Sequence, residues 1–205
     1  MYQSYIWDFD GTLYDSYPIM LKAFVKTLKE YGFDPDPAEI YYILKESSSK
    51  EVALKYNLDF KEFTRKFKAN EALDERLPVS FSGTKETLTA VCEQGGKNYI
   101  LTHRDIFSTQ ELLEREGISD LITEIVGPEN NFPRKPNPTS LLYLVDKYQM
   151  DKKQTVMIGD RTMDVLAGKG AGVKTIFYDI ENLLKAVEAD HVTHSMKEIE
   201  QIIQS

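Results

Sequence analysis

The chain has 205 residues, of which 41% are hydrophobic and 28% are charged, as in a soluble globular protein with one large domain or with a core and a modest insert. The formal net charge of −8 argues against nucleic acid or an anionic membrane as a partner, and no apolar run approaches the roughly 18 residues of a membrane span. The single Cys92 excludes an internal disulfide and no signal-like segment is visible, so we expect a cytoplasmic protein.

The first predicted element is a short buried strand that begins at Tyr5 and leads into Asp8 and Asp10. Because side chains alternate along a strand, the two carboxylates start out on the same side of it. At about 4 Å and an effective dielectric constant near 20, their repulsion is roughly 4 kcal/mol. A divalent cation that takes oxygen ligands would offset this repulsion, so the sequence predicts a metal here. Gly11 ends the strand and exposes backbone N–H groups.

A stretch without a strand pattern follows, from Tyr17 to Leu77. Apolar residues at helical spacing predict helices over about 18–31, 38–45, 50–56 and 59–76. We therefore predict that residues 16–80 form a small helical domain inserted into the chain. Residues 1–15 and 81–205 are predicted to form the core.

From Phe81 onward, short apolar strands alternate with helices. Strands are predicted at 98–102, 124–126, 155–158 and 173–177, and helices at 84–93, 108–116, after Asn137, at 162–169 and after Ser195. The alternation predicts an α/β fold, a doubly wound parallel sheet of about five strands with helices on both faces. Ligands bind at the carboxyl ends of such strands, where the strand order reverses, and Asp8, Thr102 and Asp160 all lie at predicted strand ends.

Four segments together resemble the motifs of the haloacid dehalogenase (HAD)-like hydrolase superfamily, in order and over nearly the whole chain. They are Asp8-Phe-Asp-Gly-Thr-Leu13, Thr102, Lys135-Pro-Asn-Pro138 and Gly159-Asp-Arg-Thr-Met-Asp164. The helical insertion after the first motif resembles the small (C1) cap of phosphoglycolate phosphatase-like and β-phosphoglucomutase-like members. The chain departs from many members at His103, where they place Asn after the Thr.

The resemblance implies a Mg²⁺-dependent phosphatase that hydrolyses a small phosphorylated metabolite through an aspartyl phosphate. Asp8 would be the nucleophile, and Asp10 would be the general acid and then the general base. The resemblance places the metal on the side chains of Asp8 and Asp160 and the backbone carbonyl of Asp10, with Asp164 acting through water or as an anchor. The phosphoryl group would be bound by Gly11, Thr102, His103 and Lys135.

Several alternatives stay open at this stage. His103 is either a substrate contact or a hydrogen-bonded loop histidine. In the insertion, Lys45, Ser47 and Ser48 are either substrate-binding residues or part of a plain turn between helices. A phosphomutase of the β-phosphoglucomutase type would share every core residue, and a receiver-like phosphate-binding module would also cluster Asp, Thr and Lys around Mg²⁺. We expect a monomer or a weak homodimer.

Overall fold

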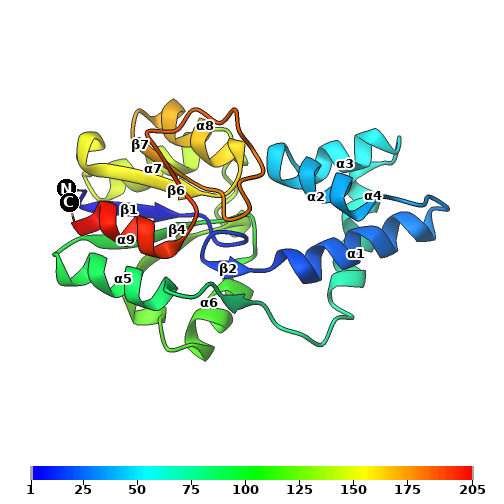
Figure 1. The fold of residues 1–205 in the computed structure, drawn as a ribbon, viewed down its shortest axis with the longest axis horizontal. Helices are drawn as coiled ribbons and strands as arrows, with labels where there is room; N and C mark the ends of the chain where they lie inside the picture. Colours follow the sequence, from blue (N-terminus) through cyan, green and yellow to red (C-terminus); the bar gives the residue numbers. More distant parts are fainter. Residues whose placement is uncertain (1, 205) are drawn as a thin grey trace. The chain divides into compact units, whose positions relative to one another are not determined.

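The computed structural model describes residues 2–204, and the chain divides into two compact units (Figure 1). The core unit comprises Met1–Tyr14 and Ser80–Ser205, and the helical unit comprises Asp15–Val79. Between residues 2 and 204, no helix has both the length and the apolar character that crossing a membrane requires.

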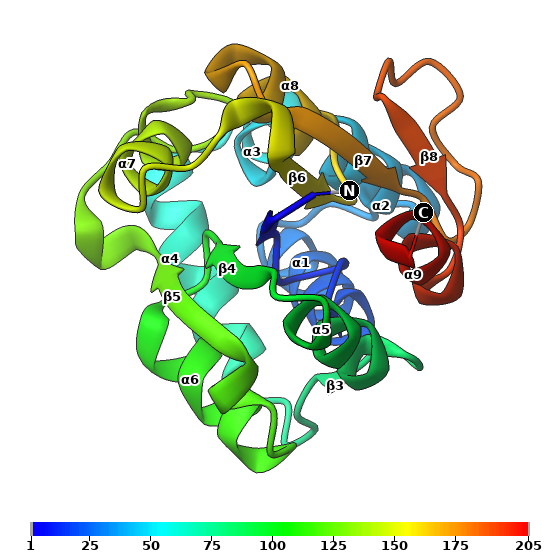
Figure 2. The same ribbon diagram turned by 90° about the vertical axis from the view of Figure 1, so that its left-hand side faces the viewer.

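The centre of the core unit is a parallel sheet (Figure 2). Its six strands are β1 (Ser4–Trp7), β4 (Lys97–Leu101), β5 (Ile122–Val126), β6 (Thr155–Gly159), β7 (Lys174–Tyr178) and β8 (His191–Thr193), in the order β5-β4-β1-β6-β7-β8. From β1 the chain builds the sheet outward on one side through β4 and β5, and then on the other side through β6, β7 and β8. The strand order therefore reverses at β1, and the end of β1 lies at the switch point where ligands bind in such sheets.

The predicted doubly wound parallel sheet is confirmed, but it has six strands rather than about five. The additional strand, β8, has only three residues, and His191 and Val192 are exposed. An edge strand this short and this exposed has no apolar run, and so the sequence pattern did not reveal it.

Helices cover both faces of the sheet. They are α5 (Thr84–Glu93), α6 (Ile106–Arg115), α7 (Thr139–Lys147), α8 (Thr162–Ala171) and α9 (Met196–Gln204). Side chains alternate along β1, so Trp7 packs with Leu88, Leu112 and Ile199 of α5, α6 and α9. Ile6 faces the other way and packs with the cluster that contains Leu144 of α7. This two-sided burial explains why the strands are continuous apolar runs.

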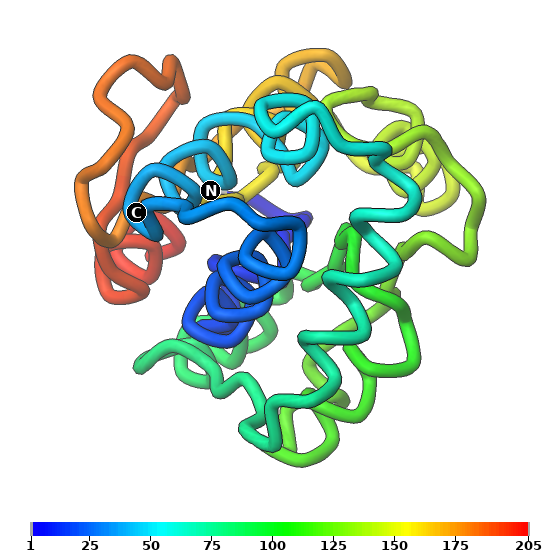
Figure 3. The backbone as a smooth tube through the Cα atoms, turned by 90° about the vertical axis from the view of Figure 1, so that its right-hand side faces the viewer, coloured from blue at the N-terminus to red at the C-terminus, as the bar shows by residue number. Residues whose placement is uncertain are grey.

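The helical unit contains α1 (Tyr17–Glu30), α2 (Pro37–Glu46), α3 (Ser49–Lys55) and α4 (Phe60–Glu71), drawn from blue to cyan in Figure 3. Its interior is rich in aromatic side chains. The centroid of the Phe24 ring lies 5.5 Å from that of Phe63 and 4.1 Å from that of Phe67. Helix α4 ends at Glu71, whereas the sequence predicted an end near Arg76. The Asp74 carboxylate instead accepts hydrogen bonds from the Arg76 side chain and from Lys22 of α1 in the segment that follows the helix.

The chain passes between the two units twice. The passages are the two short strands β2 (Tyr14–Asp15) and β3 (Val79–Ser80), which pair with each other. Within the core unit, the Phe81 N–H donates to the Leu13 carbonyl at 3.0 Å. The start and the end of the inserted segment are therefore held side by side.

Candidate active site

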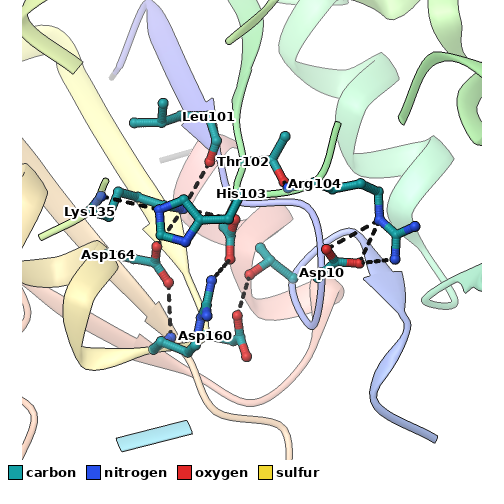
Figure 4. A network of polar contacts seen from close by, with 11 residues as sticks. Asp10, Leu101, Thr102, His103, Arg104, Lys135, Asp160 and Asp164 are labelled. Atoms are coloured by element: carbon teal, nitrogen blue, oxygen red, sulfur yellow. Dashed lines mark hydrogen bonds and ion pairs between the residues drawn. The ribbon is translucent and has the colours of Figure 1, made fainter. Parts of the chain in front are cut away.

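Three buried aspartates meet beyond the carboxyl ends of two neighbouring strands (Figure 4). Asp8 follows β1, Asp160 follows β6, and Asp164 lies in the first turn of α8. Their side chains are at most 1% exposed, and one carboxylate oxygen of each lies within 4.8 Å of the others. Buried carboxylates at this separation repel one another strongly, so the arrangement requires positive charge.

The backbone of β1 and β6 brings these residues together. Trp7 pairs with Ile158, and the Asp8 N–H donates to the Ile158 carbonyl at 2.8 Å, which places Asp8 beside the end of β6. A Cβ atom at Gly159 would lie 2.3 Å from the Asp164 side chain. Only glycine therefore allows Asp164 to pack against the end of the strand.

Lys135 supplies positive charge to this cluster. Its Nζ lies 2.8 Å from Asp8 Oδ1 and 2.7 Å from Asp164 Oδ1, and it donates to the Leu101 carbonyl at 2.8 Å. Burial lowers the pKa of Lys135, but the carboxylates of Asp164 and Asp8 outweigh burial and raise the pKa above its ordinary value. The protonated lysine is therefore favoured, and it lies in contact with the expected nucleophile.

The two oxygens of Asp164 are both engaged. One contacts Lys135, and the other accepts the Arg161 N–H at 3.0 Å. Burial and then the nearby charge of Asp8 raise the pKa of Asp164. These contacts suit an anchor that fixes Lys135 and the start of α8.

Asp160 is completely buried, and its Oδ1 accepts the Thr12 hydroxyl at 3.2 Å. This bond joins the loop after β1 to the end of β6.

Thr102 and His103 lie where β4 ends. The Thr102 hydroxyl is buried and accepts the Arg104 N–H at 3.0 Å. The Lys135 N–H donates to His103 Nε2 at 3.1 Å, so this ring nitrogen is an acceptor. Burial, followed by the charge of Lys135, lowers the pKa of His103 well below its ordinary value. The structure thus shows the hydrogen bond of the second expectation, a loop histidine that supports the loop of Lys135, and contact of His103 with a substrate stays a prediction.

Gly11 has a φ angle of 83°, which favours glycine, and its N–H donates to the Tyr14 carbonyl at 2.7 Å. The turn itself thus uses the Gly11 N–H, and phosphoryl binding by the N–H groups around Gly11 stays a prediction.

Asp10 does not belong to the group of three aspartates whose oxygens approach one another. Its carboxylate turns instead toward Arg104, to which it is bound through three hydrogen-bond contacts (Figure 4). Sequence reasoning placed no basic residue beside this aspartate, because the partner lies 94 positions along the chain.

A second arginine was also missed. Arg161 Nη2 lies 3.4 Å from Asp8 Oδ2, 153 positions away in the sequence. The available signal was the same for both arginines: each stands within two residues of a polar group at a predicted strand end. Because both arginines lie close to predicted strand ends, the sequence could have indicated that they pair with the aspartates there.

The residues proposed from the insertion lie in the helical unit. Lys45 is 1% exposed, with its Nζ 5.3 Å from the centre of the Tyr17 ring. Ser47 and Ser48 are half-buried in the turn between α2 and α3. Their role in substrate binding stays a prediction.

A pocket of about 330 Å³ lies in the core unit beside these catalytic candidates. Thr102, His103 and Lys135 form part of its wall, and residues 126–128 and 131–134 form much of the rest. This volume is at the lower end of the range for small-molecule sites.

Comparisons with known proteins identify the family of the chain. A family model described as haloacid dehalogenase-like hydrolase matches residues 5–178, so the chain belongs to this family of hydrolases, as the sequence motifs predicted. The phosphoglycolate phosphatase of Vibrio vulnificus is 26% identical, over 96% of this chain and 93% of its own. The pyrophosphatase PpaX of Halalkalibacterium halodurans is 27% identical, over 97% of this chain and 95% of its own.

Among solved structures, a protein from Bacteroides fragilis described as a haloacid dehalogenase-like hydrolase superimposes with a TM-score of 0.86 at 21% identity. The match covers 97% of this chain and 100% of that chain. At this identity the likeness establishes a common fold.

Proposed function

We propose that the protein is a Mg²⁺-dependent phosphatase that hydrolyses a small phosphorylated metabolite through a phosphoryl group carried on Asp8. The observation that supports this most is the contact of the buried Asp8 carboxylate with Lys135 inside a cluster of three aspartates. Relatives named as a phosphoglycolate phosphatase and a pyrophosphatase also support a small phosphorylated substrate.

The donor set fits Mg²⁺, which prefers oxygen ligands. Asp8, Asp160 and Asp164 place three carboxylate oxygens within 4.8 Å of one another, and a cation would offset charge that Lys135 alone does not balance. Asp8 and Asp160 would hold the ion with the Asp10 backbone carbonyl. Asp164 would act through water or as an anchor, a role that its contacts with Lys135 and with the Arg161 N–H support. Bound Mg²⁺ would neutralise charge that develops on the phosphoryl oxygens.

The residues of the chain have separate roles in this reaction. An oxygen of Asp8 attacks phosphorus, the bond to the ester oxygen breaks, and Asp10 gives its proton to the departing oxygen. Asp10 then takes a proton from water as the water oxygen attacks phosphorus and the bond to Asp8 breaks. Lys135 neutralises negative charge on Asp8 and on the transferred phosphoryl group. The Thr102 hydroxyl contributes a further hydrogen bond to the phosphoryl group.

The helical unit is proposed as the cap that selects the substrate, with Lys45, Ser47 and Ser48 as its candidate contacts. A role in selection predicts that Ser47→Ala and Ser48→Ala raise KM for the preferred metabolite. The rate with 4-nitrophenyl phosphate, which has little for a cap to recognise, should change less.

The proposed function is tested by phosphate release from 4-nitrophenyl phosphate and from a panel of phosphorylated metabolites, with and without Mg²⁺. We expect Mg²⁺-dependent turnover that Asp8→Asn abolishes. The matched control is Asp146→Asn, an exposed aspartate of α7, which should keep wild-type turnover. Full turnover by Asp8→Asn would refute the mechanism. Recovery of an isomerised sugar phosphate instead of free phosphate would indicate a phosphomutase.

A further inference from the structure

Arg104 binds Asp10 through the side of its guanidinium group. Arg104 Nη2 donates to Asp10 Oδ1 at 2.8 Å, and Arg104 Nε lies 3.0 Å from Oδ1 and 3.2 Å from Oδ2. The two side chains are only 13% and 15% exposed. A planar guanidinium in this arrangement restrains both the position and the plane of a carboxylate.

The two carboxylate oxygens of Asp10 receive unequal hydrogen bonds from Arg104. Oδ1 receives both nitrogens at the shorter distances, whereas Oδ2 receives only the longer contact from Nε. Oδ1 is thus the anchored oxygen. Oδ2 keeps more of its capacity for a proton or another hydrogen bond.

Arg104 is itself held from two directions. Its backbone N–H donates to the Thr102 hydroxyl at the end of β4 at 3.0 Å. Its side-chain Nη1 lies 3.4 Å from the Ser108 hydroxyl in α6. Its guanidinium also lies 5.9 Å from the centre of the Phe9 ring. These contacts join the anchor of Asp10 to the strand end that carries Thr102.

We propose that Arg104 is a positioning residue that holds Oδ1 of Asp10 so that Oδ2 is presented for proton transfer, an inference that rests on the proposed phosphatase function. In the first step the proton on Oδ2 moves to the ester oxygen as its bond to phosphorus breaks and the bond between Asp8 and phosphorus forms. In the second step Oδ2 receives a proton from the attacking water. Arg104 exchanges no proton in either step.

This role predicts a dependence on the leaving group. An alkyl phosphate such as ethyl phosphate releases a basic oxygen that needs a proton, whereas 4-nitrophenyl phosphate releases a stable anion. For Arg104→Gln we expect kcat/KM for ethyl phosphate to fall about 10- to 100-fold, as when a general acid is misplaced. With 4-nitrophenyl phosphate the fall should be less than about 3-fold. The leaving-group ratio, kcat/KM for ethyl phosphate divided by kcat/KM for 4-nitrophenyl phosphate, is measured on one preparation and does not depend on the fraction of folded protein.

Two further variants complete the test. Arg104→Lys keeps the charge but cannot bind the Asp10 carboxylate side-on, so its ratio of kcat/KM for ethyl phosphate to that for 4-nitrophenyl phosphate should also fall. If Arg104→Gln does not fold, the result for Arg104→Lys alone tests the positioning role. Arg76→Gln is the matched control, because Arg76 binds Asp74 through Nε and Nη2 at 2.9 Å and 2.8 Å in the helical unit, and its ratio should equal that of the wild type.

An equal loss on both esters in the Arg104 variants, or a wild-type ratio in Arg104→Lys, would overturn the positioning role. A wild-type protein that releases phosphate from neither ester in the presence of Mg²⁺ would instead overturn the proposed function.

Discussion

The core unit and the helical unit stabilise their interiors in different ways. Within the described part of the chain, five charged side chains are buried in the core unit, Asp8, Lys135, Asp160, Asp164 and Asp179, whereas Lys45 is the one buried in the helical unit. Both units have apolar interiors, and in the helical unit aromatic and aliphatic packing around Phe24 makes up nearly all of the buried interior. Burying charge is unfavourable unless each charge has a partner, so the core unit keeps an arrangement that stability alone does not explain. The proposed phosphatase chemistry would explain the four of these charges that gather at the ends of β1 and β6, namely Asp8, Lys135, Asp160 and Asp164.

The largest effect that separates the units is expected for Lys135→Met. It leaves Asp8 and Asp164 buried without their shared cation, so the free energy of unfolding should fall by about 3–5 kcal/mol and phosphate release should be lost. Lys45→Met is the comparison in the helical unit, and it should lower the free energy of unfolding by less than Lys135→Met does, because Lys45 is not shared between two buried carboxylates of a cluster. Urea unfolding followed by circular dichroism measures both. Equal losses would show that buried charge has the same importance in the two units.

Aromatic packing in the helical unit is tested by Phe24→Ala. This ring is 1% exposed and packs on two others, so its loss should reduce the free energy of unfolding by about 3–5 kcal/mol. Leu54→Ala, at a side chain that is 54% exposed in the same unit, should change it by less than about 0.5 kcal/mol. The same urea experiment applies, and a small effect of Phe24→Ala would mean that other contacts hold the unit.

Metal binding should stabilise the core unit in the absence of substrate. At a free Mg²⁺ concentration 100 times the dissociation constant, the gain is about 2.7 kcal/mol, visible as a higher melting temperature that a chelator reverses. Asp160→Asn should remove this response, because it takes a charged ligand from the three-aspartate cluster. Asp146→Asn should keep the response. A Mg²⁺ shift that persists in Asp160→Asn would locate the ion elsewhere.

The smallest expected effect is the pH dependence caused by His103. The folded protein lowers the pKa of His103 below the value near 6.5 of the unfolded chain, so between these two values the unfolded state binds more protons. The stability that depends on neutral His103 is therefore present above about pH 6.5 and is lost as the pH falls. Below about pH 6.5 the free energy of unfolding decreases with a slope that approaches about 1.4 kcal/mol per pH unit. His103→Gln should show a shallower loss between pH 6.5 and 5. Parallel pH profiles would assign the loss to other groups.

The sequence predicted the parts of the site that depend on strand ends. Asp8, Thr102 and Asp160 each follow an apolar strand, and a parallel sheet brings such ends to one edge. The motif around Lys135 indicated an ammonium group in the site, and its Nζ lies 2.8 Å from Asp8 Oδ1. Periodicity in the insertion likewise placed its helices.

What the sequence did not predict depends on contacts between distant residues. The pairing of Arg104 with Asp10 requires knowing which side chain at the end of β4 faces the loop after β1, and no local pattern carries that information. The early end of α4 has the same origin, since the following Asp74 bonds to Lys22 on another helix. Strand β8 lacked an apolar signal, and it forms because its backbone pairs with β7.

The paired strands β2 and β3 also bear on how such a molecule can be modified. The bond between the Phe81 N–H and the Leu13 carbonyl, and the bond from the Thr84 hydroxyl to that same carbonyl at 3.2 Å, lie wholly within the core unit. They fix the spacing between the two points where the insertion leaves and re-enters, whatever lies between them. A segment of different length or sequence in place of the helical unit is therefore expected to leave the core sheet folded if its two ends match this spacing.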